Sequence, residues 1–115
     1  MMATNLADQK CVPCRGGTPP LTREQIEPLA AQLEGWQVED DKKLIKSFKV
    51  KNWVAAVDFV NRITPVAEAE GHHPDITFGW GYVTVSLKTK KIKGLHENDF
   101  IIAAKLDRMA SELAS

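Results

Sequence analysis

The sequence has few of the features that mark membrane, secreted or nucleic-acid-binding proteins. None of its apolar runs approaches the roughly 18 residues that a membrane-spanning helix needs. The segment from Met1 to Asn5 lacks the apolar core of a secretory signal. Lys and Arg together number 15, as do Asp and Glu, so the formal net charge is zero and bulk electrostatic binding to nucleic acid is not expected. We therefore expect a soluble, cytoplasmic protein without membrane contact.

Cysteine is also scarce, because Cys11 and Cys14 are the only two. Their spacing is typical of a metal knuckle or a redox dithiol. A structural zinc site needs four ligands, and His72 and His73 could supply the missing two only if the N-terminal segment folded back on them. A thioredoxin-like motif needs a strand before it and a helix after it, whereas residues 15–20 are rich in Gly and Pro. We therefore expect no metal site, and a reduced pair with a structural or partner-binding role.

The composition fits a single small domain. Hydrophobic residues make up 43% of the 115 residues, enough for one modest core. Two glycines and three prolines crowd the second half of residues 1–20, which predicts a flexible N-terminal arm, with the globular domain over residues 21–115. Thr22 and Gln25 form a capping-box pattern that starts a helix, and Gly35 is expected to end it.

The middle of the chain predicts a hairpin and a helix. Residues 36–39 and 44–50 are strand-like and are separated by a polar turn over residues 40–43. The alternation of the second strand is imperfect, because Lys46 shares the parity of its apolar residues. Asn52 can cap the following helix, in which Pro65 predicts a kink rather than an end.

A second hairpin and a last helix complete the pattern. Apolar residues alternate from Ile76 to Trp80, a turn is expected at Gly81 and Tyr82, and alternation resumes over residues 83–87. The parity of Trp80 favours packing in the core. A final helix from about Glu97 to Leu113 is apolar over a broad girth, which predicts contact with a partner subunit as well as with its own sheet.

Together these elements follow the order α-β-β-α-β-β-α. Two hairpins imply antiparallel pairing, and three helices would cover one face of a four-stranded sheet. The sequence therefore predicts an α+β two-layer sandwich.

The segment from Gly71 to Asp75 carries the clearest chemical signal. His72 and His73 are adjacent where the helical pattern stops and a strand begins, and Pro74 would hold that corner rigid. Both rings could then reach one cavity, and imidazole titrates near neutrality, which suits proton transfer. The alternative is that the two histidines are merely solvated in a surface loop.

Their wider spacing resembles the pterin-4a-carbinolamine dehydratase family. The resemblance rests on an acidic residue, a His-His-Pro segment, an aromatic residue and an acidic helix start, and it extends from about Leu21 to about Met109. It implies dehydration of 4a-hydroxytetrahydropterins, the α+β fold above, dimers joined at sheet edges and tetramers joined by helices. The segments that are most specific for the family are residues 59–62, 71–75 and 97–100.

The resemblance also implies roles for individual residues. His72 occupies the position of a catalytic acid or base, and His73 that of a second catalytic, substrate-contacting histidine. Glu68 could orient an imidazole or be an exposed helix carboxylate. Trp80 could stack on a flat pterin, although core packing is favoured by its parity. The remaining candidate substrate contacts are Pro74 and Asp75; no cofactor and no metal are implied.

Lys90 departs from the family pattern, because it stands where a third histidine is expected. A hydrated lysine is protonated at neutral pH and cannot act as a base, although it could act as an acid or hold an anion. Its neighbours Lys88, Lys91 and Lys93 indicate a hydrated basic loop. The loss of one acid–base group predicts that dehydratase activity is absent or strongly impaired.

Two functions therefore stay open. The favoured hypothesis is a non-catalytic chaperone that assembles ribulose-bisphosphate carboxylase and is associated with carboxysomes. Family members in which the triad of histidine positions, here His72, His73 and Lys90, is incomplete include such assembly factors. The alternative is an active 4a-hydroxytetrahydrobiopterin dehydratase, a lyase that recycles the pterin cofactor. Either protein is expected to be a homodimer or homotetramer. Binding of nucleic acid through residues 88–93 is disfavoured by the balanced charge.

Overall fold

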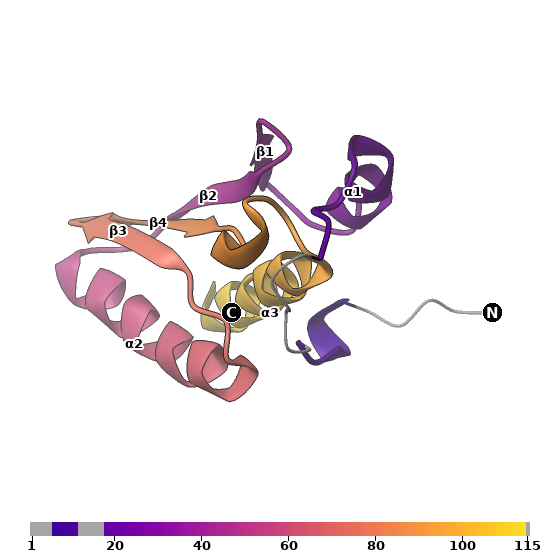
Figure 1. Ribbon diagram of the computed structural model, residues 1–115. Helices are drawn as coiled ribbons and strands as arrows, with labels where there is room; N and C mark the ends of the chain where they lie inside the picture. Colours follow the sequence, from indigo (N-terminus) through magenta and orange to yellow (C-terminus); the bar gives the residue numbers. More distant parts are fainter. Residues whose placement is uncertain (1–5, 12–17, 115) are drawn as a thin grey trace.

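The computed structural model describes residues 6–11 and 18–114. Four antiparallel strands form one sheet in the order β1-β2-β4-β3. Helices α2 and α3 lie across one face of this sheet, and α1 lies beside α3 at the β1 end (Figure 1). The predicted α+β sandwich is confirmed. The elements are η1 (Leu6–Asp8), α1 (Arg23–Ala30), β1 (Gln37–Glu39), β2 (Lys43–Lys49), α2 (Trp53–Glu70), β3 (Asp75–Gly79), β4 (Tyr82–Leu87), η2 (Lys90–Ile92) and α3 (Glu97–Ala114).

The sheet buries one face and exposes the other, as period-two alternation requires. Its buried face carries apolar side chains that pack against α2 and α3. The opposite face is polar, and there the hydroxyl groups of Ser47 and Thr84 lie 2.7 Å apart across β2 and β4. The fully buried strand residues are Leu44, Val83, Val85 and Leu87.

Lys46 lies on the buried face, and the structure explains how a charged group is tolerated there. Its Nζ donates to Asp107 Oδ1 at 2.7 Å and to the carbonyl oxygen of Glu34 at 2.7 Å. The same ammonium lies 4.6 Å from the centre of the Phe48 ring. Asp107 also accepts from Trp36 Nε1 at 3.0 Å. The position at which the alternation of β2 is broken therefore carries a lysine whose ion pair with Asp107 joins the sheet to α3.

Much of the broad apolar girth of α3 is covered within the chain itself, and its predicted contact with a partner subunit stays a prediction. Phe100, Ile101, Ile102 and Leu106 are at most 2% exposed. One side of the helix faces α2 and the sheet, and the other is covered by η1 and α1. Residues 6–11 of the N-terminal arm thus contribute to the core.

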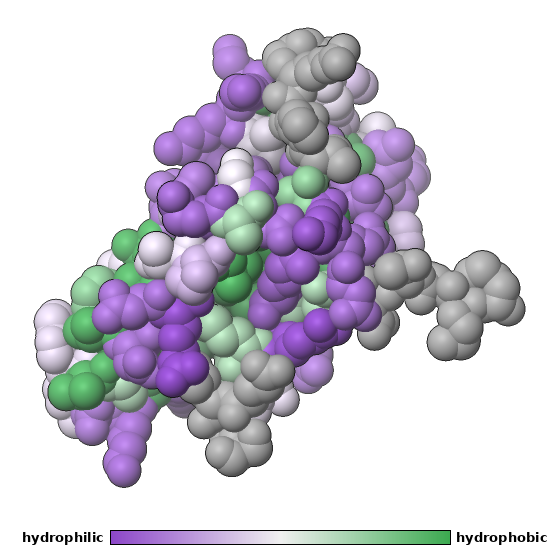
Figure 2. All heavy atoms as spheres, turned by 90° about the horizontal axis from the view of Figure 1, so that it is seen from below, coloured by the Kyte–Doolittle hydropathy of each residue, from purple (hydrophilic) through white to green (hydrophobic). Residues whose placement is uncertain are grey.

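Exposed apolar side chains lie at a different part of the molecule. Trp53 and Val54, at the start of α2, are 50% and 73% exposed, and Tyr82 is 42% exposed. Figure 2, which views the molecule from the helix side, shows apolar residues gathered at the end where α2 begins. This end of the molecule is therefore where apolar surface is available to a partner.

Two turns differ from their predicted positions. The predicted capping box of Thr22 and Gln25 is present, but α1 ends at Ala30, well before Gly35. Bonds from Gln32 and Leu33 to carbonyls three residues earlier tighten the chain there, so the helix ends without glycine. The second hairpin turns at Trp80 and Gly81, so Tyr82 already belongs to β4.

Candidate functional site

The end of α2 sets the geometry of the histidine corner. Gly71 caps the helix in the left-handed conformation, with φ 65°, and the next amide, that of His72, donates to the Ala67 carbonyl at 3.2 Å. His72, His73 and Lys90 line one hollow of about 600 Å³ beyond this corner. Two adjacent histidines and a lysine from a segment well after them in the sequence therefore share one cavity wall.

The His72 ring is held by a buried carboxylate. Its Nε2 lies 2.6 Å from Asp99 Oδ1, and the Asp99 side chain is fully buried while that of His72 is 13% exposed. Asp99 Oδ2 also accepts from the Thr89 hydroxyl at 2.8 Å and from the His96 amide at 3.0 Å. Because Asp99 already accepts two other hydrogen bonds, the His72 tautomer with its proton on Nε2 fits this contact, and that tautomer leaves Nδ1 as the unprotonated ring nitrogen.

Asp99 belongs to the candidate site, and the sequence alone did not identify it as a site residue. It was visible only as an acidic residue near the start of the last helix. In the structure it also accepts from the amide that precedes α3, and His96 Nδ1 in turn accepts from the Asn98 amide at 3.0 Å. This is a capping box with histidine in the place of serine or threonine, and that spacing is the signal that could have identified Asp99.

The second histidine makes a different contact. His73 Nε2 lies 2.6 Å from Glu68 Oε2, and these side chains are 58% and 69% exposed. Glu68 therefore partners His73, whereas His72 is partnered by Asp99. Because both groups are well hydrated, their ion pair contributes little to stability.

The remaining predicted substrate contacts do not gather in this hollow. Pro74, Asp75 and Trp80 are not among its lining residues. Trp80 is 72% exposed, so its predicted core packing is wrong. It follows the end of β3 at Gly79, where strand parity no longer decides which way a side chain points. Roles of these three residues in substrate binding stay predictions.

The arm contributes Cys11 to the wall of the hollow. Its amide donates to Glu70 Oε1 at 2.8 Å, and its Sγ contacts the Asn98 carbonyl oxygen at 3.7 Å. Burial, together with the negative charge of Glu70, raises the pKa of the Cys11 thiol to about 12. Cys14 lies outside the described residues. Within residues 6–11 and 18–114, no group of three His, Cys, Asp or Glu side chains is placed to hold a metal ion.

Cys11 should therefore react slowly with iodoacetamide. In a Cys14→Ser background at pH 8, we expect alkylation on the order of 10²–10³ slower in the folded than in the urea-unfolded protein, because the thiolate is the nucleophile. The unfolded thiol titrates near 9.0 and the folded one at about 12. Its contribution to stability is thus complete below pH 9 and is lost as the pH rises toward 12. Equal alkylation rates for the two states would contradict this burial.

The cap at Gly71 gives a second prediction. A Cβ added there would meet nothing within 4 Å, so any penalty for Gly71→Ala is due to the positive φ alone. We expect a loss of about 1–2 kcal/mol in the free energy of unfolding, measured by urea denaturation. Gly71→Asn is the matched control and should lose less, because asparagine tolerates this conformation. Equal stability of all three proteins would show that the corner does not need a left-handed residue.

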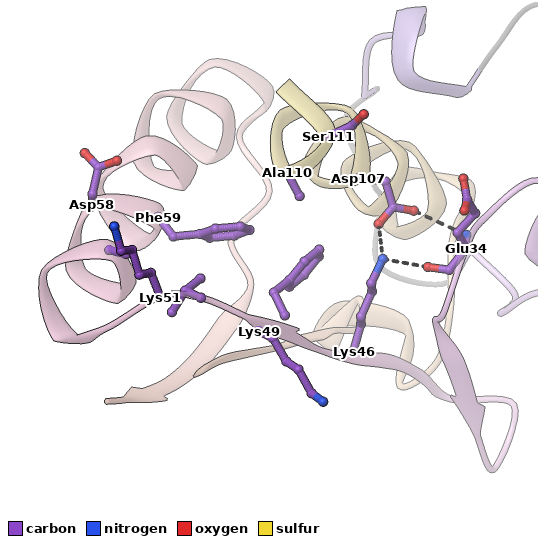
Figure 3. A pocket seen from close by; sticks show the side chains of 12 residues that line it. Glu34, Lys46, Lys49, Lys51, Asp58, Phe59, Asp107, Ala110 and Ser111 are labelled. Atoms are coloured by element: carbon purple, nitrogen blue, oxygen red, sulfur yellow. Dashed lines mark hydrogen bonds and ion pairs between the residues drawn. The ribbon is translucent and has the colours of Figure 1, made fainter. Parts of the chain in front are cut away.

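A hollow of about 670 Å³ lies elsewhere, between β2, the start of α2 and the end of α3. Figure 3 shows Lys46 pointing toward Asp107 and Glu34, with Phe59 and Ala110 on the apolar side. None of the predicted site residues lines it. Lys46 and Asp107 in its wall are paired with each other, so we take the histidine corner as the candidate site.

The comparison with known proteins gives the class. The sequence model of the pterin 4 alpha carbinolamine dehydratase family matches residues 19–109, and the chain belongs to this family. It is 52% identical to a candidate pterin-4-alpha-carbinolamine dehydratase of Rubrobacter xylanophilus over 92% of this chain and 99% of the relative. It is 50% identical to a candidate dehydratase of Halorhodospira halophila over 93% of this chain and 99% of that relative.

Solved structures agree with the family. A transcriptional coactivator/pterin dehydratase from Brucella melitensis superposes with a TM-score of 0.75 at 30% identity, covering 79% of this chain and 98% of the other. A pterin dehydratase-like protein, described as a RuBisCO assembly factor in the alpha-carboxysome, superposes with a TM-score of 0.58 at 25% identity, covering 67% and 90%. No helix in the described ranges is long and apolar enough to span a membrane.

Proposed function

We propose that the protein is a 4a-hydroxytetrahydropterin dehydratase in which His72 transfers the proton. The observation that carries this proposal is the contact between His72 and the buried carboxylate of Asp99 in the wall of the hollow. A ring fixed by a buried partner, with its other nitrogen unoccupied by that partner, is suited to general acid–base chemistry. Burying the Asp99 carboxylate has a desolvation cost, which its three hydrogen-bond donors offset.

The reaction needs two proton movements. The bond between C4a and the hydroxyl oxygen breaks, and N5 loses its proton as the C4a–N5 double bond forms. His72 Nδ1 can take the N5 proton, and Asp99 then stabilises the resulting imidazolium. The leaving hydroxide needs a proton to become water, and the Lys90 ammonium in the wall of the same hollow can donate it or a hydrogen bond.

In this proposal Lys90 is an acid and not a missing base. A lysine cannot replace a base, but it can replace an acid, so a third imidazole is not required for every role in the reaction. Support comes from relatives about half identical to this chain that are candidate dehydratases. A cytoplasmic location and a homodimer or homotetramer remain part of the proposal, with the apolar surface near Trp53 as the contact available to another subunit.

One solved structure supports a second function, that of an assembly chaperone. The similarity to a RuBisCO assembly factor of the alpha-carboxysome is compatible with a non-catalytic chaperone that has kept this fold and lost activity through Lys90. That proposal predicts impaired carboxylase assembly when the protein is deleted from its host. Unchanged assembly in the deletion strain would remove it.

A dehydratase assay separates the two functions. We expect the unmodified protein to turn over a 4a-hydroxytetrahydropterin, Lys90→His to stay active, and Lys90→Ala to lose about 10²-fold or more in rate. Lys49→Gln, an exposed lysine of β2 outside the histidine hollow, is the matched control. If Lys90→His turned over the substrate and the unmodified protein did not, the result would instead support the non-catalytic hypothesis, in which Lys90 has abolished the activity.

A further inference from the structure

The histidine hollow shares part of its wall with a second, basic hollow. Lys88 and Lys90 line both of them. The second hollow has a volume of about 400 Å³, and its wall also contains Lys42, Lys43 and Lys93. The fold therefore brings lysines from the β1–β2 turn and from the segment before α3 to one place beside the proposed catalytic histidine.

These lysines, which we call the lysine wall (Lys42, Lys43, Lys88, Lys90 and Lys93), are mostly without ionic partners. Within the described part of the chain, only Lys43 forms an ion pair, to Glu39 Oε1 at 3.4 Å. The acidic side chains in this hollow are Glu39 and Asp40, so five cations face two carboxylates. Like charges gathered in a hollow repel one another and raise the local concentration of anions.

The backbone around the lysine wall is also held in costly conformations. Lys93 ends η2 with φ 55°, a left-handed conformation that glycine adopts more easily. The segment is closed by a hydrogen bond of 2.9 Å from the Thr89 amide to the Gly94 carbonyl. Left-handed non-glycine residues concentrate at binding sites, where the surrounding structure maintains them. The strained backbone at Lys93 and the repulsion among the lysines therefore occur in the same segment, which precedes α3.

We infer that the substrate is a tetrahydropterin whose side chain carries an anionic group, a phosphate ester or a carboxylate. This inference rests on the proposed function. In this arrangement the pterin ring occupies the histidine hollow. Its side chain extends along Lys88 and Lys90, which line both hollows, so that the anionic group lies among the other lysines of the lysine wall. Ammonium groups form charge-assisted hydrogen bonds with such oxygens, and here no described residue competes for Lys42, Lys88, Lys90 or Lys93 through an ion pair.

The test compares 4a-hydroxytetrahydropterins that differ only in the side chain: neutral hydroxyalkyl, phosphate monoester, and glutamyl carboxylate. With the full-length protein at low salt, we expect kcat/KM for at least one anionic substrate to exceed that of the neutral one by about tenfold or more. The preference should shrink as salt rises from about 0.01 M to about 1 M, because the Debye length falls from ~30 Å to ~3 Å. Which anionic substrate is preferred distinguishes a phosphate from a carboxylate. Equal kcat/KM for all three would overturn the inference.

Variants of the lysine wall give an independent check. Lys42→Gln combined with Lys93→Gln should lower the anionic-to-neutral preference by about tenfold, since both lysines line the basic hollow and not the histidine hollow. Lys49→Gln, on β2 and outside both hollows, should keep the preference of the unmodified protein. A preference that survives the double variant would place the anion elsewhere and contradict the inference.

Equilibrium binding separates failure of this inference from failure of the proposed function. Fluorescence titration with stable oxidised pterins bearing the same three side chains needs no turnover. Tighter binding of the anionic pterins by a protein that does not catalyse dehydration would support the lysine wall and remove the dehydratase. Turnover of all substrates with equal affinities would keep the dehydratase and remove the lysine wall.

Discussion

Replacing His72 by glutamine is expected to lower kcat for pterin dehydration by about 10²–10⁴-fold, the usual contribution of a general acid–base group. Glutamine keeps an N–H donor that can reach Asp99, so the contact that holds the side chain at 2.6 Å can be preserved. It has no basic ring nitrogen, so the proton of the substrate has no acceptor. The measurement is the initial rate at saturating substrate, with the unfolding midpoint recorded for each protein.

His73→Gln is the matched comparison for this result. The two histidines are adjacent, but His73 is exposed and its partner Glu68 is exposed as well. We expect its substitution to change KM more than kcat, because the ring is not held by a buried group. If His72→Gln retained full kcat, or if both variants lost kcat equally, the assignment of proton transfer to His72 would be wrong.

Asp99→Ala is expected to lower the free energy of unfolding by about 3–5 kcal/mol, because three hydrogen-bond donors lose the buried carboxylate that accepts from them. The fully buried carboxylate joins three segments through His72, Thr89 and the amide of His96. Its removal leaves three donors without their acceptor in the interior. Urea denaturation measures the loss.

Two further variants make this prediction specific. Asp99→Asn should lose less stability than Asp99→Ala, because its carbonyl oxygen still accepts. Asp58→Ala removes an exposed carboxylate of α2 that pairs with Arg62 at 2.9 Å, and should cost no more than about 0.5 kcal/mol. A loss for Asp99→Ala as small as that for Asp58→Ala would show that the buried network does not hold the site together.

The sequence was most informative where a local rule decides the structure. The capping box at Thr22, the cap at Asn52 and the alternation of apolar residues in β4 depend on neighbours within a few positions, and the structure has all three. Lys46 shows an intermediate case. The broken alternation was visible, but its partner Asp107 lies 61 residues away and could not be identified from local pattern.

The site itself depends on longer contacts. Asp99 meets His72 across 27 residues, and no local pattern links a helix cap to a distant imidazole. The segment that covers part of the apolar girth of α3, with Leu6 only 3% exposed, shows no helical or strand pattern in the sequence, so its packing against α3 could not be predicted. Trp80 was misplaced for the opposite reason, since a strand rule was extended one residue into a turn. The boundary of the arm at residue 20 stays a prediction.

The most direct test of the account is the rate of 4a-hydroxytetrahydropterin loss in the presence of the unmodified protein at substoichiometric concentration. For a dehydratase that uses His72, this rate rises above that of the spontaneous reaction in proportion to protein concentration, and it returns to the spontaneous rate with His72→Gln. A rate that does not depend on the concentration of the unmodified protein, while the protein is folded, would contradict it.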